Sequence, residues 1–177
     1  KKALLSAQYL SNLINDVLDM AKIESGKFEL NENYLSIDEV EEYIDAIIVP
    51  LAEEKGIEFI RRVPENELYH YVYADVNRIR QVLINILSNA VKYTPMGGRV
   101  EYTVSREEYE PGHLRIQFQI KDNGIGMTKE FQKVAFEPFE QAESSFSGSG
   151  SGLGLTLAKS LVEMMGGQIT AKSAPGN

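Results

Sequence analysis

The stretch Arg80-Gln-Val-Leu-Ile-Asn85-Ile-Leu-Ser-Asn89-Ala-Val-Lys92-Tyr93-Thr94 combines an apolar helical pattern with polar side chains at helical spacing. Apolar residues recur here, and in the residues just before, at steps of three and four, which predicts one long helix. Asp75 is suited to cap its start, and the helix is expected to run to about Tyr93. Because Asn85, Asn89 and Lys92 fall at i, i+4 and i+7, we expect them on one face.

The polar residues of this face have the chemistry of a metal and phosphate site. An amide oxygen is a hard, neutral ligand that suits Mg²⁺, which keeps waters and phosphate oxygens at its other positions. Lys92 supplies a point charge suited to phosphate. A structural role fits the same residues, since Asn85 and Asn89 could cap a neighbouring loop while Lys92 is merely solvated. The spacing alone does not separate these two interpretations.

A second polar segment, Asp122-Asn-Gly124-Ile-Gly126, directly follows an expected strand. Asp-Asn-Gly after a strand is usually a simple turn. The second glycine permits another unusual backbone conformation, or the close approach of a flat ligand to the main chain. In that interpretation, the Asp122 carboxylate could accept a hydrogen bond from an exocyclic amine such as that of adenine.

A third segment, Gly148-Ser-Gly150-Ser-Gly152-Leu-Gly154-Leu155, opens the last predicted helix. Its glycines and serines expose backbone N–H groups, and a helix N-terminus favours anions. A flexible linker has a similar composition but seldom runs straight into Leu-Gly-Leu and an apolar helix. Neither G-x-x-x-x-G-K-[ST] nor G-x-G-x-x-G is present, so a P-loop or Rossmann protein is not expected.

The rest of the chain predicts an α+β fold, with a mixed or antiparallel sheet and helices segregated on one face. Helices are expected at about 1–25, 36–55, 75–93 and 153–165, and strands at 57–63, 69–73, 99–105, 114–121 and 168–173, with a strand and a return between 28 and 35. The apolar stripe of the first helix suggests packing against a partner helix or, alternatively, its own domain. Acidic residues at the start of the second helix, including Glu41 and Glu42, are expected to complement its dipole.

Composition excludes several classes of function. The 177 residues contain no Cys, which excludes disulfides, thiolate metal sites and cysteine nucleophiles. The net charge of −8 comes with no basic stripe, so a nucleic-acid partner is not expected. No apolar run approaches the ~20 residues of a membrane span, and we expect no membrane contact by this chain.

With the three segments in this order, the sequence resembles the catalytic ATP-binding domain of sensor histidine kinases, which has the Bergerat (GHKL) fold. Residues 80–94 resemble the family's N box, 122–127 its first glycine box and 150–155 its second. Phe136-Glu-Pro-Phe139 resembles its F box. The resemblance implies a two-layer α/β sandwich with a mixed sheet and helices on one face.

The segment 16–26 is similar to the end of the family's dimerisation helix and its linker. The resemblance therefore divides the chain in two. Residues 1–26 would be the C-terminal part of the dimerisation helix with its linker. Residues 27–177 would be the catalytic ATP-binding domain, ending before the family's last strand.

The resemblance also implies a role for each residue of the site. Asn89 would hold Mg²⁺ with Asn85 beside it, and Lys92 would touch a phosphate of ATP. Asp122 would accept from the adenine amine, and the segment from about Thr128 would be a mobile ATP lid that ends at Gly150. The implied catalytic residues are Asn85, Asn89 and Lys92, and the implied nucleotide-binding residues are Asn89, Lys92, Tyr93, Asp122, Gly124, Gly126, Gly150, Ser151, Gly152, Leu153 and Gly154.

The implied activity is transfer of the γ-phosphoryl group of ATP to a histidine, for relay to an aspartate of a response regulator in a bacterial two-component system. The implied partners are the dimerisation and phosphoacceptor domain of the same protein, a response regulator receiver domain, and a second copy in the intact protein. The domain is expected in the cytoplasm, and the resemblance allows a membrane anchor elsewhere. Water-using ATPases of the superfamily carry a Glu general base at position 85. Asn cannot take a proton, so Asn85 favours a phosphotransferase.

Two departures from the family pattern bear on activity. Neither His70 nor His113 lies in the family's phosphoacceptor setting, H-E/D-x-R/K-x-P, so we expect no autophosphorylation by this chain alone. Val134 stands where many relatives carry Arg or Lys, although Lys133 or Lys129 could substitute. A degenerate domain that binds nucleotide without phosphotransfer therefore stays open as the alternative. A water-using ATPase and a plain helical interaction module explain the sequence less well.

Overall fold

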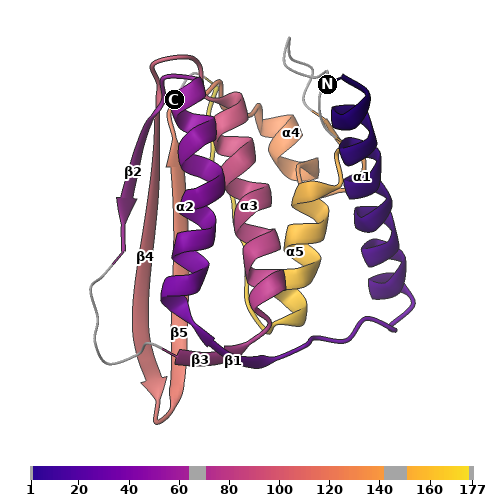
Figure 1. The fold of residues 1–177 in the computed structure, drawn as a ribbon, viewed down its shortest axis with the longest axis vertical. Coiled ribbons are helices and arrows are strands. Elements are labelled where there is room, and N and C mark those ends of the chain that lie inside the picture. Colours follow the sequence, from indigo (N-terminus) through magenta and orange to yellow (C-terminus); the bar gives the residue numbers. More distant parts are fainter. Residues whose placement is uncertain (1, 64–70, 142–150, 176–177) are drawn as a thin grey trace.

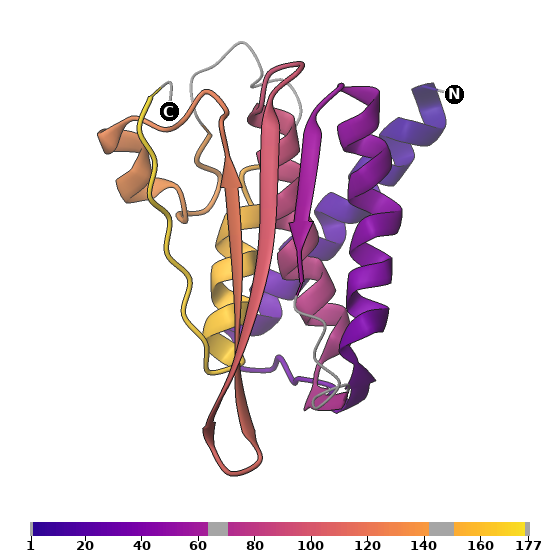
Figure 2. The same ribbon diagram turned by 90° about the vertical axis from the view of Figure 1, so that its left-hand side faces the viewer.

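The computed structural model describes residues 2–63, 71–141 and 151–175, which form a layer of helices against one face of a sheet (Figures 1 and 2). The helices are α1 (Lys2–Glu24), α2 (Ile37–Glu54), α3 (Val76–Tyr93), α4 (Lys129–Val134) and α5 (Gly154–Met164). The strands are β1 (Asn33–Ser36), β2 (Glu58–Arg62), β3 (Tyr71–Ala74), β4 (Arg99–Glu110) and β5 (His113–Asp122). The expected α+β class is confirmed.

The main sheet has the order β2-β4-β5 and mixes both strand directions. β2 pairs with β4 in parallel, and β4 pairs with β5 in an antiparallel hairpin. β1 and β3 form a separate antiparallel pair in which Leu35 lies opposite Val72. The parallel pair requires a crossover between β2 and β4, and α3 lies on that crossover.

Helix α3 is buried on two sides. Its residues Leu83, Leu87 and Val91 belong to a core cluster with α2 and the sheet, where Ile44, Ile48, Val100 and Tyr102 are almost fully buried. Its residues Val82 and Ile86 instead pack in a second cluster, with Leu157, Ala158 and Leu161 of α5. The wide apolar stripe predicted from the sequence therefore serves two interfaces.

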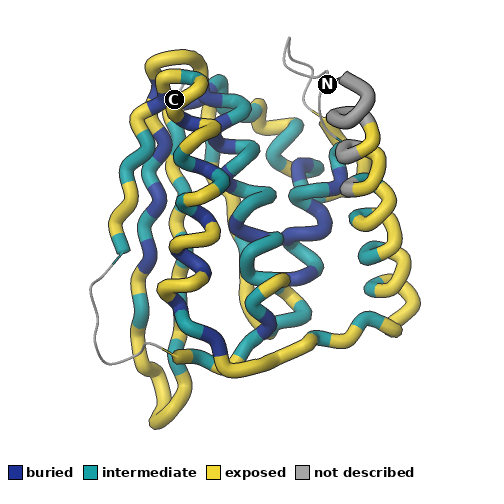
Figure 3. Tube along the Cα trace, viewed as in Figure 1, coloured by how far each residue is buried: buried dark blue, intermediate teal, exposed yellow. Residues whose placement is uncertain are grey.

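Helix α1 is joined to the rest of the structure through its C-terminal half. Met20 and Ile23 pack against the α3–α5 cluster. Asp19 accepts a hydrogen bond from the Arg78 guanidinium at 2.7 Å. Leu10, at 56% exposure, and other apolar residues on the same helix face solvent (Figure 3). Association of this surface with a second copy stays a prediction.

Three expectations differ from the structure. Residues 168–173 form no strand but run as irregular chain on the β5 side of the sheet (Figure 2). A strand needs a ladder of hydrogen bonds to a neighbour, and Ser173 instead exchanges hydrogen bonds with Gln132. Residues 27–32 are likewise irregular, so only the return strand, β1, forms. Helix α4 was not anticipated. Thr128 caps it by accepting from the Phe131 amide at 3.1 Å.

Glu41, one of the acidic residues near the start of α2, is buried, at 4% exposure. Its carboxylate accepts a hydrogen bond from the Tyr102 hydroxyl at 3.0 Å, and the Arg61 guanidinium lies 3.7 Å away. Burial raises the pKa of Glu41, and the Tyr102 hydrogen bond and the charge of Arg61 offset this in part. Burial beside Glu41 also raises the pKa of Tyr102.

Replacing Glu41 by Gln tests this buried charge, since Gln keeps an acceptor for Tyr102. The raised folded-state pKa means that the folded protein binds the Glu41 proton more tightly than the unfolded chain does. The contribution of Glu41 to the parent's free energy of unfolding should therefore fall as the pH rises from the ordinary Glu value, about 4.3, through the folded-state pKa. Urea unfolding across this range should show that Glu41→Gln removes this decline and is more stable near neutral pH.

The exposed neighbour Glu42 supplies the matched control. Glu42→Gln should leave the parent's pH dependence in place. A Glu41→Gln variant that keeps this pH dependence would contradict the account of the buried carboxyl.

Candidate functional site

The polar face of α3 is turned toward the start of α5. The Asn85 side chain is half-buried, and its Nδ2 donates a hydrogen bond to the Gly154 carbonyl at 3.2 Å. Asn89 and Lys92 follow on the same face, also half-buried, and the Lys92 ammonium lies 4.7 Å from the centroid of the Tyr93 ring. The structure thus brings the second glycine segment against the first residue of the polar face.

Among the described residues, the N-cap residue of α5, Leu153, makes no side-chain capping hydrogen bond. Leu153 precedes the helix, and its nearly buried side chain offers no acceptor for the first backbone N–H groups. Those groups carry the positive end of the helix dipole. A Cβ on Gly154 would lie 3.6 Å from the Asn85 Cγ, so the amide and the helix end are in contact distance. An uncapped helix start beside amide side chains suits an anion such as phosphate.

Asp122 ends β5 on the side that faces the helices. Burial alternates along β5, so residues 116, 118, 120 and 122 share that side. The Asp122 Oδ1 accepts a hydrogen bond from the Gly124 amide at 2.9 Å, which closes a tight turn. The next amide, of Ile125, donates to the Tyr93 carbonyl at 3.2 Å. The first glycine segment is therefore hydrogen-bonded to the C-terminal end of α3.

Backbone from elsewhere in the chain packs closely against both glycines of this turn. A Cβ on the buried Gly124 would lie 2.7 Å from the Tyr93 carbonyl oxygen. Gly126 has a φ of +68°, and a Cβ there would run into the Ala174 carbonyl. The C-terminal segment lies over this turn, because the Met127 amide donates to the Ser173 hydroxyl at 2.9 Å. The close packing explains why side chains are excluded at both positions.

The second glycine segment is joined to the segment that resembles the F box. The Phe139 amide donates to the Gly152 carbonyl at 3.1 Å, and Gly152 has a φ of +72°. Phe139 itself has a φ of +66° and is 68% exposed. A non-glycine residue in this conformation carries strain, which clusters at functional positions. Ser151 accepts from the Leu153 amide at 3.2 Å, while Gly150 lies outside the described residues.

The expected lid, 128–150, is described only in its first half. That half begins with α4, which carries Val134 together with the exposed side chains of Lys129 and Lys133. The Gln132 side chain donates to the Ser173 carbonyl at 2.7 Å and so attaches α4 to the C-terminal segment. Residues 142–150 lie outside the described residues.

The described part of the site offers a metal the amide oxygens of Asn85 and Asn89 and the carboxylate of Asp122. Within 2–63, 71–141 and 151–175, no three His, Cys, Asp or Glu side chains gather as metal ligands. A hard cation held here would therefore need most of its ligands from a bound phosphate and water, which is how Mg²⁺ is commonly bound. The amide oxygens of Asn85 and Asn89, with the ammonium of Lys92, fit such a group.

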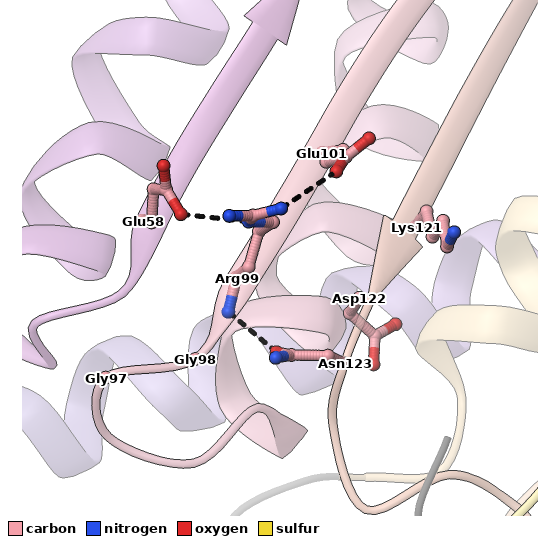
Figure 4. Close-up of a pocket in the computed structure, with 8 residues that line it drawn as sticks. All are labelled: Glu58, Gly97, Gly98, Arg99, Glu101, Lys121, Asp122 and Asn123. Atoms are coloured by element: carbon pink, nitrogen blue, oxygen red, sulfur yellow. Dashed lines mark hydrogen bonds and ion pairs between the residues drawn. The ribbon is translucent and has the colours of Figure 1, made fainter.

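A separate pocket of about 280 Å³ opens on the helix-free face of the sheet (Figure 4). Arg99 pairs there with Glu58 at 2.8 Å and with Glu101 at 3.8 Å. Asp122 and Asn123 reach its edge, but none of the polar residues of α3 lines it. This pocket therefore shares Asp122 with the arrangement on the helix side but none of the polar residues of α3.

Two supporting residues of the site were missed by sequence reasoning. The Asn123 side chain accepts from the Arg99 amide at 2.6 Å and joins the ends of β4 and β5. The Lys55 ammonium reaches three carbonyls at the end of α3. Asn123 could have been found as a turn residue, since Asn often bonds to nearby backbone. Lys55 has no comparable signal, because its partners lie more than 35 residues away.

The chain is similar to known proteins in sequence and in fold. A family model described as "Histidine kinase-, DNA gyrase B-, and HSP90-like ATPase" matches residues 74–177. The autoinducer 2 sensor kinase/phosphatase LuxQ of Vibrio cholerae is 41% identical over 177 residues, which cover 97% of this chain and 20% of LuxQ. The chain thus spans about a fifth of the length of the curated relatives it matches.

Two solved structures share the fold. The crystal structure of full-length ShkA in complex with AMPPNP matches with a TM-score of 0.74 and 32% identity, over 95% of this chain and 35% of ShkA. The histidine kinase AdeS of Acinetobacter baumannii matches with a TM-score of 0.76 and 22% identity, over 99% of this chain and 78% of the AdeS chain. None of the described helices of this chain is long and apolar enough to cross a membrane.

Alanine at Gly126 should cost more stability than alanine at Gly112. Both glycines have a positive φ, +68° and +77°, which costs a side chain about 1–2 kcal/mol. A Cβ at position 112 would meet nothing within 4 Å, whereas one at 126 would meet the Ala174 backbone. Urea unfolding should therefore give a larger loss for Gly126→Ala. Equal losses would show that residues 173–175 do not pack on this turn.

Proposed function

The chain belongs to the family of histidine kinase-, DNA gyrase B- and HSP90-like ATPases, and we propose that it is the ATP-binding catalytic part of a sensor histidine kinase. Within this proposal, residues 1–26 are the end of a dimerisation helix with its linker. Residues 27–177 are the catalytic domain. It binds ATP with Mg²⁺ and transfers the γ-phosphoryl group to a histidine on another domain.

The observation that carries the proposal is the pair of hydrogen bonds that tie both glycine segments to one helix. Asn85 of α3 donates to Gly154, and Tyr93 of α3 accepts from Ile125. An uncapped helix start and an acidic turn thereby flank the same polar face. A nucleotide has an anionic end and a flat, hydrogen-bonding base, and these two flanks suit one end each.

At the base end, Asp122 is proposed to accept from the adenine amine. Only one of its oxygens is used by the Gly124 amide among the described contacts, and the carboxylate has further acceptor sites. Gly124 and Gly126 are proposed to shape the turn that presents Asp122 to the base, since neighbouring backbone occupies the place of a side chain at both positions. Tyr93 is proposed to pack near the ribose or adenine.

At the phosphate end, Asn89 is proposed to hold Mg²⁺, with Asn85 beside it, and Lys92 to contact phosphate. The start of α5, with Ser151, Gly152, Leu153 and Gly154, supplies the N–H groups for phosphate oxygens, and Gly150 belongs to the same proposal. The metal would neutralise the negative charge on the phosphate oxygens while the γ-phosphoryl group is transferred. Every group proposed here binds or positions, and none has to accept a proton.

Position 85 supports transfer to a protein acceptor over hydrolysis. An Asn amide cannot serve as a general base for water. A histidine acceptor brings its own lone pair, which forms the N–P bond as the bond from γ-phosphorus to the bridging oxygen breaks. ADP leaves with the electron pair, and the second ring nitrogen of the acceptor releases its proton to solvent. Position 85 in this chain therefore suits a phosphotransferase.

The acceptor and the onward partners belong to the proposal as well. The proposed first partner is the acceptor domain of the same protein, and the second is a receiver domain of a response regulator. A second copy of the chain is the proposed partner of α1. The proposed location of the domain is the cytoplasm, where it would be part of an intact protein that includes other domains. A degenerate domain without phosphotransfer is not favoured, because LuxQ, 41% identical across 97% of this chain, is named a sensor kinase.

Phosphotransfer to an acceptor supplied in trans tests the proposal. The chain should be mixed with a separate dimerisation domain that carries the acceptor histidine, and with ATP labelled in its γ-phosphoryl group. We expect acid-labile label on that domain and none when its histidine is replaced by Gln. Release of free phosphate at the same rate without any acceptor would contradict the proposal and indicate a hydrolase.

Asn89→Ala tests the proposed metal ligand. The Mg²⁺-dependent part of ATP binding should weaken at least tenfold, or about 1.4 kcal/mol, because the variant lacks the amide oxygen. Titration calorimetry with Mg²⁺ and with EDTA measures this, and thermal unfolding should be little changed. Asn77, exposed on the same helix, supplies the control, and Asn77→Ala should bind as the parent does. Parent-like Mg²⁺ dependence in Asn89→Ala would remove Asn89 from the metal site.

A further inference from the structure

Lys55 lies just after α2, yet its ammonium donates hydrogen bonds to the C-terminal end of α3. Its Nζ donates to the carbonyls of Val91 at 2.9 Å, Lys92 at 2.6 Å and Thr94 at 2.6 Å. Val91 and Thr94 are buried, at 4% and 0% exposure. One cation therefore serves three neighbouring acceptors where two of the residues have little access to water.

These contacts complete the hydrogen bonding of the helix end. The last four carbonyls of an α-helix have no partner within the helix. In α3, the Ala90 carbonyl accepts from the Thr94 amide at 3.1 Å, and the Tyr93 carbonyl accepts from the Ile125 amide at 3.2 Å. Lys55 supplies the donors for the two carbonyls between them. A cation there also complements the negative end of the helix dipole.

The helix end has little freedom to move without disturbing the glycine turn. The Tyr93 carbonyl that receives the Ile125 amide is also the atom that a Cβ on Gly124 would meet at 2.7 Å. A change in the direction of that carbonyl therefore alters a turn that is already closely packed. The same turn carries the Asp122 oxygen that accepts from Gly124 at 2.9 Å.

The solvation of Lys55 supports this role. Loss of contact with water lowers the pKa of its ammonium from the ordinary lysine range, and the three carbonyls stand in for the lost water. Removing the ammonium would leave the Val91 and Lys92 carbonyls without this donor. A buried acceptor that loses its donor destabilises the local structure.

We propose that Lys55 is a positioning residue of the nucleotide site: its ammonium fixes the last turn of α3 and, through Tyr93, the orientation of the Asp122–Gly126 turn. Lys55 touches no nucleotide in this proposal. Its effect on the nucleotide is indirect. Lys55 holds the end of α3 that carries Lys92 and Tyr93, and Tyr93 in turn holds the acidic turn. The part of the proposal that concerns affinity depends on the function proposed above.

The experiment compares Lys55→Met, which keeps an unbranched apolar chain but no ammonium, with Lys55→Arg, which keeps the cation and its donors. Amide hydrogen exchange of the ligand-free protein is read at residues 122–126, which lie far from position 55 in sequence. Lys55→Met should speed exchange of the Ile125 amide at least tenfold, and Lys55→Arg should largely restore it. Lys22, exposed in the last turn of α1, supplies the control, and Lys22→Met should match the parent.

Nucleotide affinity is the second readout, measured at a temperature where circular dichroism shows every variant folded. Mg²⁺-ATP binding should weaken at least tenfold in Lys55→Met and recover in Lys55→Arg. Lys55→Leu, which likewise has no side-chain donor, replaces Lys55→Met if that variant does not fold. Parent-like exchange at residues 122–126 in the Met or Leu variant would overturn the proposal. A parent that binds no ATP would refute the proposed function instead, while the exchange readout still decides the role of Lys55.

Discussion

Burial of α3 on two sides at once is the constraint on which the rest of the structure depends. Its Leu83, Leu87 and Val91 side packs on α2 and the sheet, and its Val82 and Ile86 side packs on α5. A helix held from both sides cannot rotate or slide without exposing one cluster to water. The direction of its remaining polar face is therefore set by apolar packing rather than by the polar residues themselves.

The site follows from that constraint. The core clusters position the Asn85–Lys92 face, and hydrogen bonds then attach a glycine segment near each end of it. Asn85 holds Gly154 at the start of α5, and Tyr93 holds Ile125 after β5. Lys55 completes the C-terminal end by meeting carbonyls that the helix leaves unpaired. Glycine is required in these segments because backbone from elsewhere occupies the space of a side chain, as at Gly124, Gly126 and Gly152.

Much of this could be predicted from the sequence because the signals are local. The three- and four-residue apolar steps and the Asp75 cap predicted α3, and Asp75 does accept from the Asn77 and Arg78 amides. Alternation predicted β4 and β5. Features that depend on distant partners could not be predicted in this way. Glu41 is buried because Tyr102, 61 residues away, meets it, and Lys55 acts on carbonyls of another helix.

Residues 168–173 show that a local sequence signal can also predict an element that does not form. Their composition suits a strand, but a strand forms only where a neighbour completes its ladder, and Ser173 bonds instead to Gln132. For the site, spacing predicted which residues share a face of α3, and it could not predict that Asn85 would donate to Gly154. The resemblance supplied the assignment of roles that spacing left open.

The central claim is that the polar face of α3, the Asp122 turn and the start of α5 form one site for Mg²⁺-ATP. Titration calorimetry with ATP and with GTP, each in Mg²⁺ and in EDTA, tests it most directly on the protein as it stands. The account predicts Mg²⁺-dependent binding with a clear preference for ATP, because the metal joins Asn89 to phosphate while Asp122 recognises the adenine amine. Equal binding of the two nucleotides, or binding unaffected by EDTA, would contradict it.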